Sequence, residues 1–445
     1  MTNFLITGGC GFVGSNFINY YYNKNKNCNI INIDAMYYCA SHEKVLEEIK
    51  RSNRYTFYEG NICDYDLLKD IFNKHNITHI IHFAAESHVD NSFNQSLQYT
   101  KDNVIGTHTL LEAIKNIDRN IILLHFSTDE VYGESKLCDE EKTEDSLLCP
   151  TNPYAASKAA AEMFIRSYIY SFNLKILISR GNNIYGKNQY PEKLIPKFIK
   201  QLKENKKCTI QGNGSSIRNF IHIDDVCSAV NIILEKGCFG QIYNIGNDSL
   251  GEESVLDITK HLIKKIKNTD NYQEYIEYTK DRPFNDQRYL ISNDKLKNLG
   301  WEITKKLNVE LDVLVKDFKC VLDNYAFFIL NTTNTKNLIE LCNKIRSFSK
   351  CKIYIIYTDI NSELNNSISK FKNIKLIKND ISYYNPLVHY KYFYNTSSCE
   401  KGIFIDDNLS VKLIDYIFEN LNTNYLNISK KINSNMSTDE YNLFY

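Results

Sequence analysis

Apolar and polar positions alternate in a regular rhythm through the first half of the chain. Short apolar runs of strand length are separated by longer stretches in which apolar residues recur every three or four positions, as on one face of a helix. Nearly continuous apolar strands that alternate with helices are typical of a parallel sheet covered on both faces. We therefore predict an α/β fold with a Rossmann-like, doubly wound parallel sheet. The expected strands are residues 3–7, 29–34, 55–59, 79–83, 121–127 and 175–180, and the expected helices include residues 13–22, 97–117 and 154–170.

The rhythm loosens near residue 187 and a new one starts at residue 325. Between these points the elements are shorter and are separated by polar loops such as "QGNGSSIRN", which predicts a smaller α/β domain interleaved with the first. Later apolar runs predict a separate small α/β domain. The expected parts of the chain are residues 1–186, 187–324 and 325–445, and the later apolar runs are residues 326–330, 352–357, 374–377 and 402–405.

The first expected strand is followed by a glycine-rich turn, in the segment "FLITGGCGFVGSNF". Gly8, Gly11 and Gly14 let the backbone turn tightly and approach a pyrophosphate, whose negative charge is favoured at the N-terminus of the next helix. Twenty residues beyond Gly14 the second strand ends in Asp34, which is placed to accept hydrogen bonds from the adenosine ribose. A carboxylate there repels a 2′-phosphate. The pattern therefore predicts an NAD-binding domain in residues 1–186.

A second pattern, "NPYAASKAAAE", places Tyr154 and Lys158 four residues apart at the head of an expected helix. This spacing puts both side chains on one helical face. An ammonium beside a phenol, with a positive nicotinamide nearby, lowers the pKa of the phenol toward neutrality. The tyrosinate can then take a proton from a substrate hydroxyl while hydride leaves the same carbon. Taken alone the pattern is common on helix surfaces, but together with the glycine turn it favours a catalytic pair.

Two adjacent carboxyl groups, Asp129 and Glu130 in "STDEVYG", follow the apolar run of residues 121–126. Burial of a charged group costs free energy, so a buried strand that ends in two acids needs a reason. Adjacent carboxyls in a partly dry site push their pKa values apart, which leaves one protonated and the other ionised. The pair therefore indicates an acid and a base rather than two solvated acids at a strand end.

The composition narrows the classes of function. The 445 residues fit two or three domains, and a hydrophobic content of 43% is enough for packed cores. Lysine plus arginine and aspartate plus glutamate number 53 each, so no basic excess points to nucleic acid or an anionic membrane as partner. The 13 cysteines lack any C-x-x-C pair, and no apolar run has membrane-spanning length. We expect a soluble, cytoplasmic protein without a metal site.

With these motifs in order, the chain resembles the extended short-chain dehydrogenases/reductases and, among them, the nucleotide-sugar 4,6-dehydratases. The resemblance covers about residues 3–320 and includes "HFAAESHVDNS", "RGNNIYGKNQYPEKLIPKFI", "RNFIHIDDV" and "YNIGN". The segment "DRPFNDQRY" is most similar to the UDP-glucose 4,6-dehydratases of plant-type rhamnose synthesis. The resemblance implies a hydro-lyase that converts UDP-glucose to UDP-4-keto-6-deoxy-glucose, a step toward rhamnose or another deoxysugar.

The resemblance gives each of the five catalytic candidates a role. Thr128 and Tyr154, with Lys158 beside the phenol, act at the C4 oxygen while C4 is oxidised. Oxidation makes the C5 proton acidic, Glu130 abstracts that proton, and protonated Asp129 gives its own proton to the departing C6 hydroxyl. The hydride then returns to C6, and the cofactor ends as it began. Related epimerases and decarboxylases lack the Asp-Glu pair, which therefore separates a dehydratase from them.

The resemblance also implies residues that contact the two ligands and a likeness in assembly. The family usually dimerises through a four-helix bundle, so we expect a homodimer formed by residues 97–117 and 154–170. The expected contacts to NAD are Gly8, Gly11, Phe12, Val13, Gly14, Asp34, Asn61, Ile62, Ala84, Ala85, Tyr154 and Lys158. The expected contacts to the nucleotide sugar are Ser87, Thr128, Asn183, Glu192, Lys193, Leu194, Arg218, Arg282 and Asn285, with Arg218 suited to the diphosphate.

Two positions depart from the family pattern. Asn61 in "EGNICD" stands where the family normally carries an aspartate that bonds the adenine amino group. Its side-chain oxygen can still accept a hydrogen bond, so we expect NAD to bind. Asp102 in "YTKDNVIGT" stands where a threonine is common near the nicotinamide side, and the contact at this position is left open.

Residues 325–445 lie outside the resemblance. They open with a β-α-β pattern, and a later apolar run ends in Asp406 and Asp407. This combination faintly resembles the start of a nucleotide-sugar glycosyltransferase, whose Asp-x-Asp motif holds a metal. The two aspartates are adjacent here, and ~120 residues is short for a complete enzyme. A degenerate or protein-binding α/β module is the favoured interpretation, and the function of this part stays unknown.

Two kinds of alternative stay open. The first is the same reaction on dTDP-glucose or UDP-N-acetylglucosamine, because the preference for the base depends on loops. The second, from another class, is a nucleotide-sugar-binding scaffold without turnover. The intact set of five catalytic candidates argues against a scaffold, which has no need of all of them.

Overall fold

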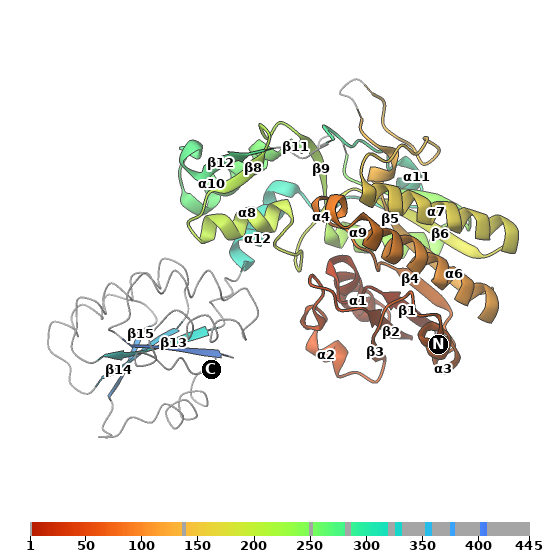
Figure 1. Ribbon diagram of the computed structural model, residues 1–445, viewed down its shortest axis with the longest axis horizontal. Coiled ribbons are helices and arrows are strands. Elements are labelled where there is room, and N and C mark those ends of the chain that lie inside the picture. Colours follow the sequence, from red (N-terminus) through yellow and green to blue (C-terminus); the bar gives the residue numbers. More distant parts are fainter. Residues whose placement is uncertain are drawn as a thin grey trace. The chain divides into compact units, whose positions relative to one another are not determined.

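The computed structural model describes residues 2–318 except 136–138, 249–251 and 281–285, and beyond them the backbone of four strands (Figure 1). The chain divides into two compact units. The first comprises Met1–Leu202 and Lys207–Lys316, and the second comprises Lys203–Lys206 and Asp317–Tyr445. The finer division that the sequence predicts near residue 187 stays a prediction.

The first unit is built on a seven-stranded parallel sheet, in the order β10-β6-β5-β4-β1-β2-β3. The chain forms β1 centrally, continues outward to β3, and then crosses back to add the other strands on the opposite side. This is the predicted doubly wound arrangement, and all six expected strands occur within one residue of their predicted ends. The strands are β1 Thr2–Thr7, β2 Cys28–Asp34, β3 Tyr55–Glu59, β4 His79–His82, β5 Ile122–Thr128, β6 Lys175–Gly181 and β10 Ile242–Ile245.

Helices cover both faces of this sheet, which explains why its strands are buried almost throughout (Figure 1). Helices α1 and α9 pack on one face through side chains such as Phe17 and Val230. Helices α3, α6 and α7 pack on the other face through Leu68, Leu110 and Ile165. The helices of this layer structure are α1 Phe12–Lys24, α2 Glu47–Lys50, α3 Tyr65–His75, α4 Val89–Asn94, α7 Pro153–Phe172, α9 Ile223–Lys236 and the short turns η1 His42–Lys44 and η3 Asp129–Tyr132.

The helix expected over residues 97–117 contains a π-helical turn. Such turns are rare in proteins, and those that occur are often found at functional sites. Two side chains of the turn, Asp102 and Asn103, are buried. Asn103 holds the loop after β4, since its Oδ1 accepts from the Glu86 amide at 2.8 Å. The segment consists of α5 Ser96–Tyr99, the π-helical turn η2 Thr100–Ile105 and α6 Gly106–Ile117.

The shorter elements after β6 form two small sheets with their own helices. One sheet has the order β11-β9-β7, with β9 antiparallel to β11 and parallel to β7. The other pairs β12 with β8. These elements are β7 Asn183–Tyr185, β8 Cys208–Gln211, β9 Ile217–His222, β11 Glu252–Ser254, β12 Ile276–Thr279, α8 Leu194–Lys203, α10 Val255–Lys267, η5 Tyr272–Tyr275, α11 Asp294–Lys297 and α12 Leu307–Asp317.

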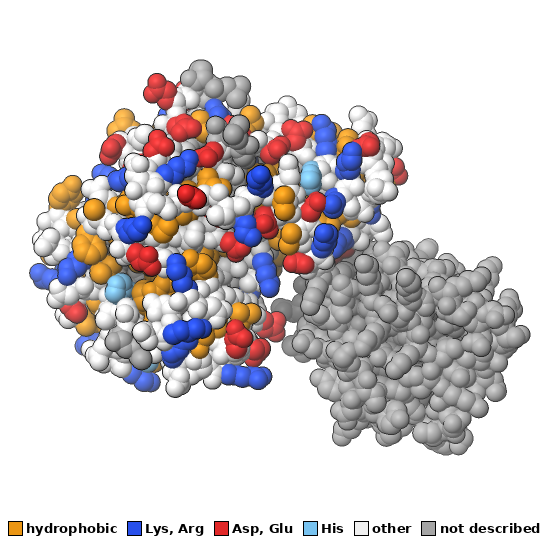
Figure 2. Space-filling model, turned by 180° about the vertical axis from the view of Figure 1, so that it is seen from behind, with side chains coloured by type: hydrophobic (Ala, Val, Ile, Leu, Met, Phe, Trp, Pro, Cys, Tyr) orange, Lys and Arg blue, Asp and Glu red, His pale blue; other side chains and the backbone are white. Residues whose placement is uncertain are grey.

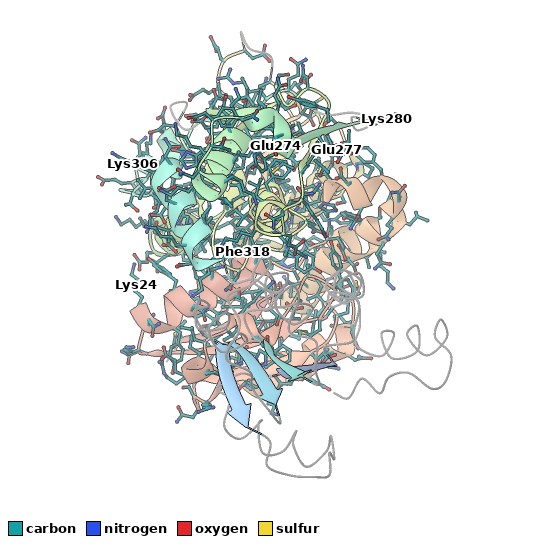
Figure 3. All side chains as sticks on the ribbon, turned by 90° about the vertical axis from the view of Figure 1, so that its left-hand side faces the viewer. Lys24, Glu274, Glu277, Lys280, Lys306 and Phe318 are labelled. Atoms are coloured by element: carbon teal, nitrogen blue, oxygen red, sulfur yellow. The ribbon has the colours of Figure 1, made fainter. Side chains whose placement is uncertain are left out.

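Charges of both signs are interspersed over the face of the described surface that Figure 2 shows. The exposed Glu274, Glu277 and Lys280, labelled in Figure 3, lie on η5, on β12 and just after β12. The face in Figure 2 therefore presents no broad field of one sign to a charged partner. Among the described residues, no helix has the length and apolar character that crossing a membrane requires.

The second unit contains a four-stranded parallel sheet in the order β15-β14-β13-β16. The four strands that the apolar runs predict are all present. Asp406 ends the last strand, whereas Asp407 lies outside the described residues, so the resemblance to a metal-binding pair stays untested. The strands are β13 Tyr325–Asn331, β14 Lys352–Tyr357, β15 Ile374–Lys378 and β16 Lys401–Asp406.

Candidate active site

A cavity of about 350 Å³ lies in the first unit, at the carboxyl ends of β1, β2, β4 and β5. The order of the sheet reverses between β1 and β4, and ligands of doubly wound proteins bind at such a switch point. The predicted site residues that line the cavity are Gly8, Gly11, Phe12, Val13, Gly14, Asp34, Asn61, Ile62, Ala84, Ala85, Ser87, Thr128, Asp129, Glu130, Tyr154, Lys158, Asn183, Glu192, Lys193 and Leu194.

The glycine turn fits the close approach of a pyrophosphate. Gly8 has a φ of +70°, and a Cβ there would lie 2.6 Å from the amide nitrogen of Ala84. A Cβ on Gly14 would lie 2.3 Å from the carbonyl oxygen of Gly8. Gly11 caps α1 without a side-chain hydrogen bond, and residues 11–14 at the start of this 13-residue helix line the cavity, so no capping side chain competes with a ligand there. The cradle therefore suits a dinucleotide.

Asp34 joins the glycine turn to the end of β2. Its Oδ2 accepts from the amide of Cys10 at 2.8 Å, and its Oδ1 accepts from the amide of Met36 at 2.9 Å. Burial raises the pKa of Asp34, and these backbone donors oppose the rise. The side chain lines the cavity beside the turn, which is the place that an acceptor for the adenosine ribose requires.

The two adjacent acids lie at the end of β5, where Thr128 starts the short turn η3. The Thr128 hydroxyl accepts from the amide of Glu130 at 3.3 Å and donates to Oδ1 of Asp129 at 3.4 Å. Asp129 is only 2% exposed, and its Oδ2 has no hydrogen-bond partner among the described residues. A buried, unpartnered carboxyl oxygen in a cavity wall is suited to meeting a ligand.

The two acids differ in their surroundings. Burial raises the pKa of Asp129 well above its ordinary value, and the neighbouring Glu130 raises it further. Burial also raises the pKa of Glu130, but the side-chain amide of Asn152 donates to Oε2 of Glu130 at 2.9 Å and opposes the rise. Asp129 is therefore the member of the pair that retains its proton, and Glu130 is the member that is stabilised as a carboxylate.

Tyr154 and Lys158 project from the first turns of α7, which Asn152 caps by accepting from the Ala155 amide at 2.9 Å. Burial lowers the pKa of Lys158 to about 8, and its ammonium donates to the carbonyl of Phe126 at 2.7 Å. The expected lowering of the Tyr154 pKa is not found in the protein itself. Burial, followed by the negative charge of Glu130, raises the pKa of Tyr154 instead, and a hydrogen bond with Thr128 opposes this rise.

A buried polar cluster behind β5 supports the catalytic candidates, and the sequence analysis missed it. Ser127 donates to Oε1 of Glu162 at 2.6 Å, and Glu162 pairs with Arg180 at 2.6 Å. The guanidinium of Arg180 lies 4.6 Å from the ring centre of Tyr132. Glu162 follows Lys158 by one helical turn, and this spacing was the signal that could have revealed it. The cluster fixes both ends of the Thr128–Tyr132 segment.

The residues expected to contact the sugar come from two loops that meet at the cavity. The hydroxyl of Tyr38, from the loop after β2, donates to the carboxylate of Glu192 at 2.9 and 3.0 Å. Lys193 donates to the carbonyl of Ser87 at 2.9 Å. The structure thus brings Ser87, Glu192 and Lys193 together from distant parts of the sequence.

One other predicted substrate residue is not part of the cavity wall, and two more lie outside the described residues. Arg218, on β9, is absent from the lining, and its guanidinium lies 5.5 Å from the ring centre of Tyr289. Arg282 and Asn285 lie outside the described residues. No group of three or more His, Cys, Asp and Glu side chains suited to a metal ion occurs in the part of the chain that the structure describes.

The two departures from the family pattern are in contact with each other. Oδ1 of Asn61 accepts from the amide of Cys63 at 2.8 Å, and its Nδ2 lies 3.3 Å from Oδ1 of Asp102. Oδ1 of Asn61 thus faces the backbone, and the expected contact of this oxygen with the adenine stays a prediction. Asp102, which lies in the π-helical turn, is in contact with the loop after β3.

Comparison with known proteins identifies relatives of the first unit. Residues 5–315 match the family described as GDP-mannose 4,6 dehydratase. A dTDP-D-glucose 4,6-dehydratase of Dictyostelium discoideum is 42% identical over 75% of this chain and 85% of its own length. A trifunctional UDP-glucose 4,6-dehydratase/UDP-4-keto-6-deoxy-D-glucose 3,5-epimerase/UDP-4-keto-L-rhamnose-reductase of Arabidopsis thaliana is 43% identical over 67% of this chain and 44% of its own length.

A solved structure shows the same fold. The dTDP-glucose 4,6-dehydratase DesIV of Streptomyces venezuelae, with NAD and TYD bound, superposes with a TM-score of 0.66 at 32% identity. It covers 71% of this chain and 96% of its own. The match of residues 5–315, the identity with curated relatives and the shared sheet show that this chain belongs to the GDP-mannose 4,6 dehydratase family.

Proposed function

We propose that this chain is an NAD-dependent nucleotide-sugar 4,6-dehydratase that converts UDP-glucose to UDP-4-keto-6-deoxy-glucose, in the synthesis of rhamnose or another deoxysugar. The observation that supports this proposal most is the contrast between Asp129 and Glu130. One buried carboxyl is held protonated directly beside another that receives an amide donor, and elimination of water needs such an acid and base. The relatives named as dTDP-D-glucose and UDP-glucose 4,6-dehydratases support the same reaction.

NAD fits the cavity through the glycine turn and Asp34. The turn would approach the pyrophosphate with its backbone, and Asp34 would accept from the adenosine ribose. Bound NAD supplies a hydride acceptor for C4, a positive charge beside the phenol, and the same hydride for return to C6. Solved relatives that contain NAD support this assignment.

Tyr154 and Thr128 are proposed to act at the C4 hydroxyl. Tyr154, as its phenolate, takes the proton of this hydroxyl, and Thr128 donates a hydrogen bond to the same oxygen. Lys158 is fixed by the Phe126 carbonyl at the bottom of the cavity, where its pKa of about 8 leaves it largely protonated at neutral pH. Its positive charge favours the phenolate form of its helical neighbour.

Glu130 and Asp129 are proposed to divide the elimination between them. Glu130 accepts the C5 proton, which the C4 ketone has made acidic. Protonated Asp129 gives its proton through the otherwise unpartnered Oδ2 to the C6 hydroxyl, which leaves as water. The returning hydride adds to C6 of the C5–C6 double bond that results, and C5 regains a proton from Glu130. The two protons move in opposite directions, so a carboxyl in each protonation state is required at once.

The nucleotide base is the finer part of the proposal. UDP-glucose is favoured by the segment "DRPFNDQRY", although residues 281–285 of it lie outside the described residues. A second candidate, dTDP-glucose, is favoured by relatives of that name in Dictyostelium discoideum and Bos taurus, at 42% and 45% identity. Either substrate uses the same catalytic residues.

Incubation of the purified full chain with UDP-glucose, dTDP-glucose and UDP-N-acetylglucosamine, in separate reactions, tests this function. The expected result is a product lighter than UDP-glucose by one water, detected by mass spectrometry. The same loss from dTDP-glucose alone would keep the reaction and correct the base. No loss of water from any of the three, by protein that retains NAD, would contradict dehydration and favour a binding scaffold.

We also propose that the enzyme acts as a cytoplasmic homodimer. Apolar side chains are exposed on the predicted pairing segments, among them Leu97, Ile105, Met163 and Tyr170. A four-helix bundle between two copies would bury them, which the hydrophobic effect favours. Light scattering should give twice the chain mass, and replacement of both Leu97 and Tyr170 by lysine should give the mass of one chain. A wild-type monomer at the concentration of the assay would contradict the dimer.

A further inference from the structure

The cavity has a second end, on the far side of Asp34 from the catalytic candidates, and it contains a buried carboxyl group that the proposed reaction does not use. Asp102 lines the cavity and is 6% exposed. Asn61, Ile62 and Gly60, which follow β3, line the same end. The inference drawn from this end depends on the proposal above that the cavity binds NAD.

The side-chain oxygen of Asn61 is engaged by the backbone rather than turned toward Asp102. Its Oδ1 faces the backbone amide of Cys63 at 2.8 Å, which fixes the orientation of the side-chain amide. A reversed amide would direct an N–H group at another N–H group. The Nδ2 of Asn61 therefore faces the other way, toward the hydroxyl of Tyr37 at 2.9 Å and Oδ1 of Asp102 at 3.3 Å. At position 61 the cavity meets a hydrogen-bond donor.

Asp102 is the acceptor at this end. Its Oδ1 receives the Tyr37 hydroxyl at 3.2 Å and the Asn61 amide, and its Oδ2 receives the Gln98 amide at 2.6 Å. A carboxylate offers about four acceptor sites, so a further site on Oδ2 stays open to a ligand. All three donors are neutral side chains, from Tyr37, Asn61 and Gln98. A buried carboxylate without a cation is stabilised by each additional donor.

The sheet determines which part of a dinucleotide reaches Asp102. The proposed reaction takes place at Thr128, above β5, whereas Asp34 and Asn61 follow β2 and β3 on the opposite side of β1. A dinucleotide whose pyrophosphate lies on the glycine turn extends its adenosine over β2 and β3. The edge of adenine carries an exocyclic amino group, which is a hydrogen-bond donor and matches an acceptor.

We propose that Asp102, rather than residue 61, provides the carboxylate that recognises the adenine amino group of NAD in this chain. The acidic side chain of this contact is at position 102 here, and the neutral side chain is at position 61. Asn61 positions the Asp102 carboxylate by donating a hydrogen bond to it. The two departures from the family pattern thus compensate each other. This exchange explains how a chain without the usual aspartate at position 61 retains a specific adenine site.

The consequence is selectivity against a hypoxanthine base, which carries a carbonyl oxygen in place of the amino group. That oxygen would face the Asp102 carboxylate, acceptor against acceptor. A hydrogen bond to a charged group is strong enough for a preference of about tenfold or more. The wild-type chain should therefore retain NAD about tenfold or more in preference to nicotinamide hypoxanthine dinucleotide.

Competition between these two dinucleotides tests the proposal without use of catalytic activity. The full chain is incubated with a large excess of both in equal amounts, desalted and denatured, and the released nucleotides are quantified by chromatography. Asp102→Asn should lower the preference for NAD to about one, because Nδ2 of an asparagine can donate to the hypoxanthine oxygen. The exchanged double variant Asn61→Asp/Asp102→Asn should restore the preference, because it returns a carboxylate to the contact at the other position.

The outcomes separate this inference from the proposed function. Retention of NAD with the wild-type preference by Asp102→Asn would overturn the assignment of Asp102 and leave the dehydratase proposal intact. If the double variant does not regain the preference for NAD, although its unfolding temperature is near that of the wild type, the proposal that the two positions compensate each other would be overturned. Retention of neither dinucleotide by the wild-type chain would contradict both proposals.

Discussion

The two ends of the cavity hold buried acids in opposite surroundings. At the end of β5, Asp129 lies beside a second carboxyl, has an oxygen without a partner, and has a raised pKa. At the end of β3, the two oxygens of Asp102 receive three neutral donors. Burial is similar at the two ends, so the neighbouring groups decide the role. Asp129 is suited to donating a proton, and Asp102 is suited to accepting a hydrogen bond.

Replacing Glu130 should have the largest effect at the catalytic end. Glu130→Gln removes the base for the C5 proton, and we expect kcat to fall by about 10²–10⁴-fold. Exchange of the C5 hydrogen with deuterated water should disappear together with dehydration, as followed by mass spectrometry. Glu140→Gln, an exposed change of the same kind, should leave kcat unaltered. Retention of C5 exchange by Glu130→Gln would assign the base to another group.

Replacing Asp129 should separate the two acids. Asp129→Asn preserves the shape of the side chain but removes the proton donor, so kcat for loss of water should fall by about 10²-fold or more. Glu130 still removes and returns the C5 proton, so exchange into deuterated water should continue. The measurement is the ratio of exchanged substrate to dehydrated product. Equal loss of exchange and dehydration would contradict the division of roles.

Removing one member of the Glu162–Arg180 ion pair behind β5 should lower the stability of the fold more than it lowers catalytic activity. Glu162 and Arg180 are 0% and 1% exposed and form a direct pair. Glu162→Gln leaves the guanidinium buried without its counter-ion, and we expect unfolding to become easier by about 3–5 kcal/mol. Replacing both residues, Glu162→Gln with Arg180→Met, should recover much of this loss because no uncompensated charge remains. Chemical denaturation measures the free energy of unfolding of both variants. An equal loss in the single and the double variant would show that the unpaired charge does not cause the destabilisation.

The smallest expected effect is the way in which Asp129→Asn changes the pH dependence of stability. The folded-state pKa of Asp129 is raised, so the stability this group contributes is present below its unfolded-state pKa and is lost as the pH rises through the folded-state value. Asp129→Asn avoids this loss. The unfolding temperature of the variant relative to the wild type should therefore increase as the pH rises above about 4, by about 2–4 °C for each kcal/mol. Scanning calorimetry measures it, with the exposed Asp70→Asn as control, and a difference that shrinks as the pH rises would contradict the raised pKa.

The sequence predicted the sheet and most of the cavity because both depend on local patterns. Buried parallel strands show as apolar runs, and β1 to β6 follow from them within one residue at each end. The glycine turn and the Tyr154–Lys158 spacing predict the residues that line the cavity. The strand β10, Ile242–Ile245, was not predicted.

Contacts between distant residues could not be predicted in the same way. Asn61 and Asp102 are 41 positions apart, and their contact depends on a π-helical turn that no spacing rule revealed. Burial and the negative charge of Glu130 raise the pKa of Tyr154, and the depth of a side chain is a property of the packed fold. Each departure seemed separate in the sequence and is part of one contact in the structure.

The fate of the C4 hydrogen tests the central proposal most directly. UDP-glucose labelled with deuterium at C4 is converted in ordinary water, and the product is analysed by mass spectrometry and NMR. The account predicts loss of one water, deuterium in the C6 methyl group and a solvent hydrogen at C5. Deuterium that remains at C4 without loss of water, as an epimerase would leave it, would contradict a 4,6-dehydratase.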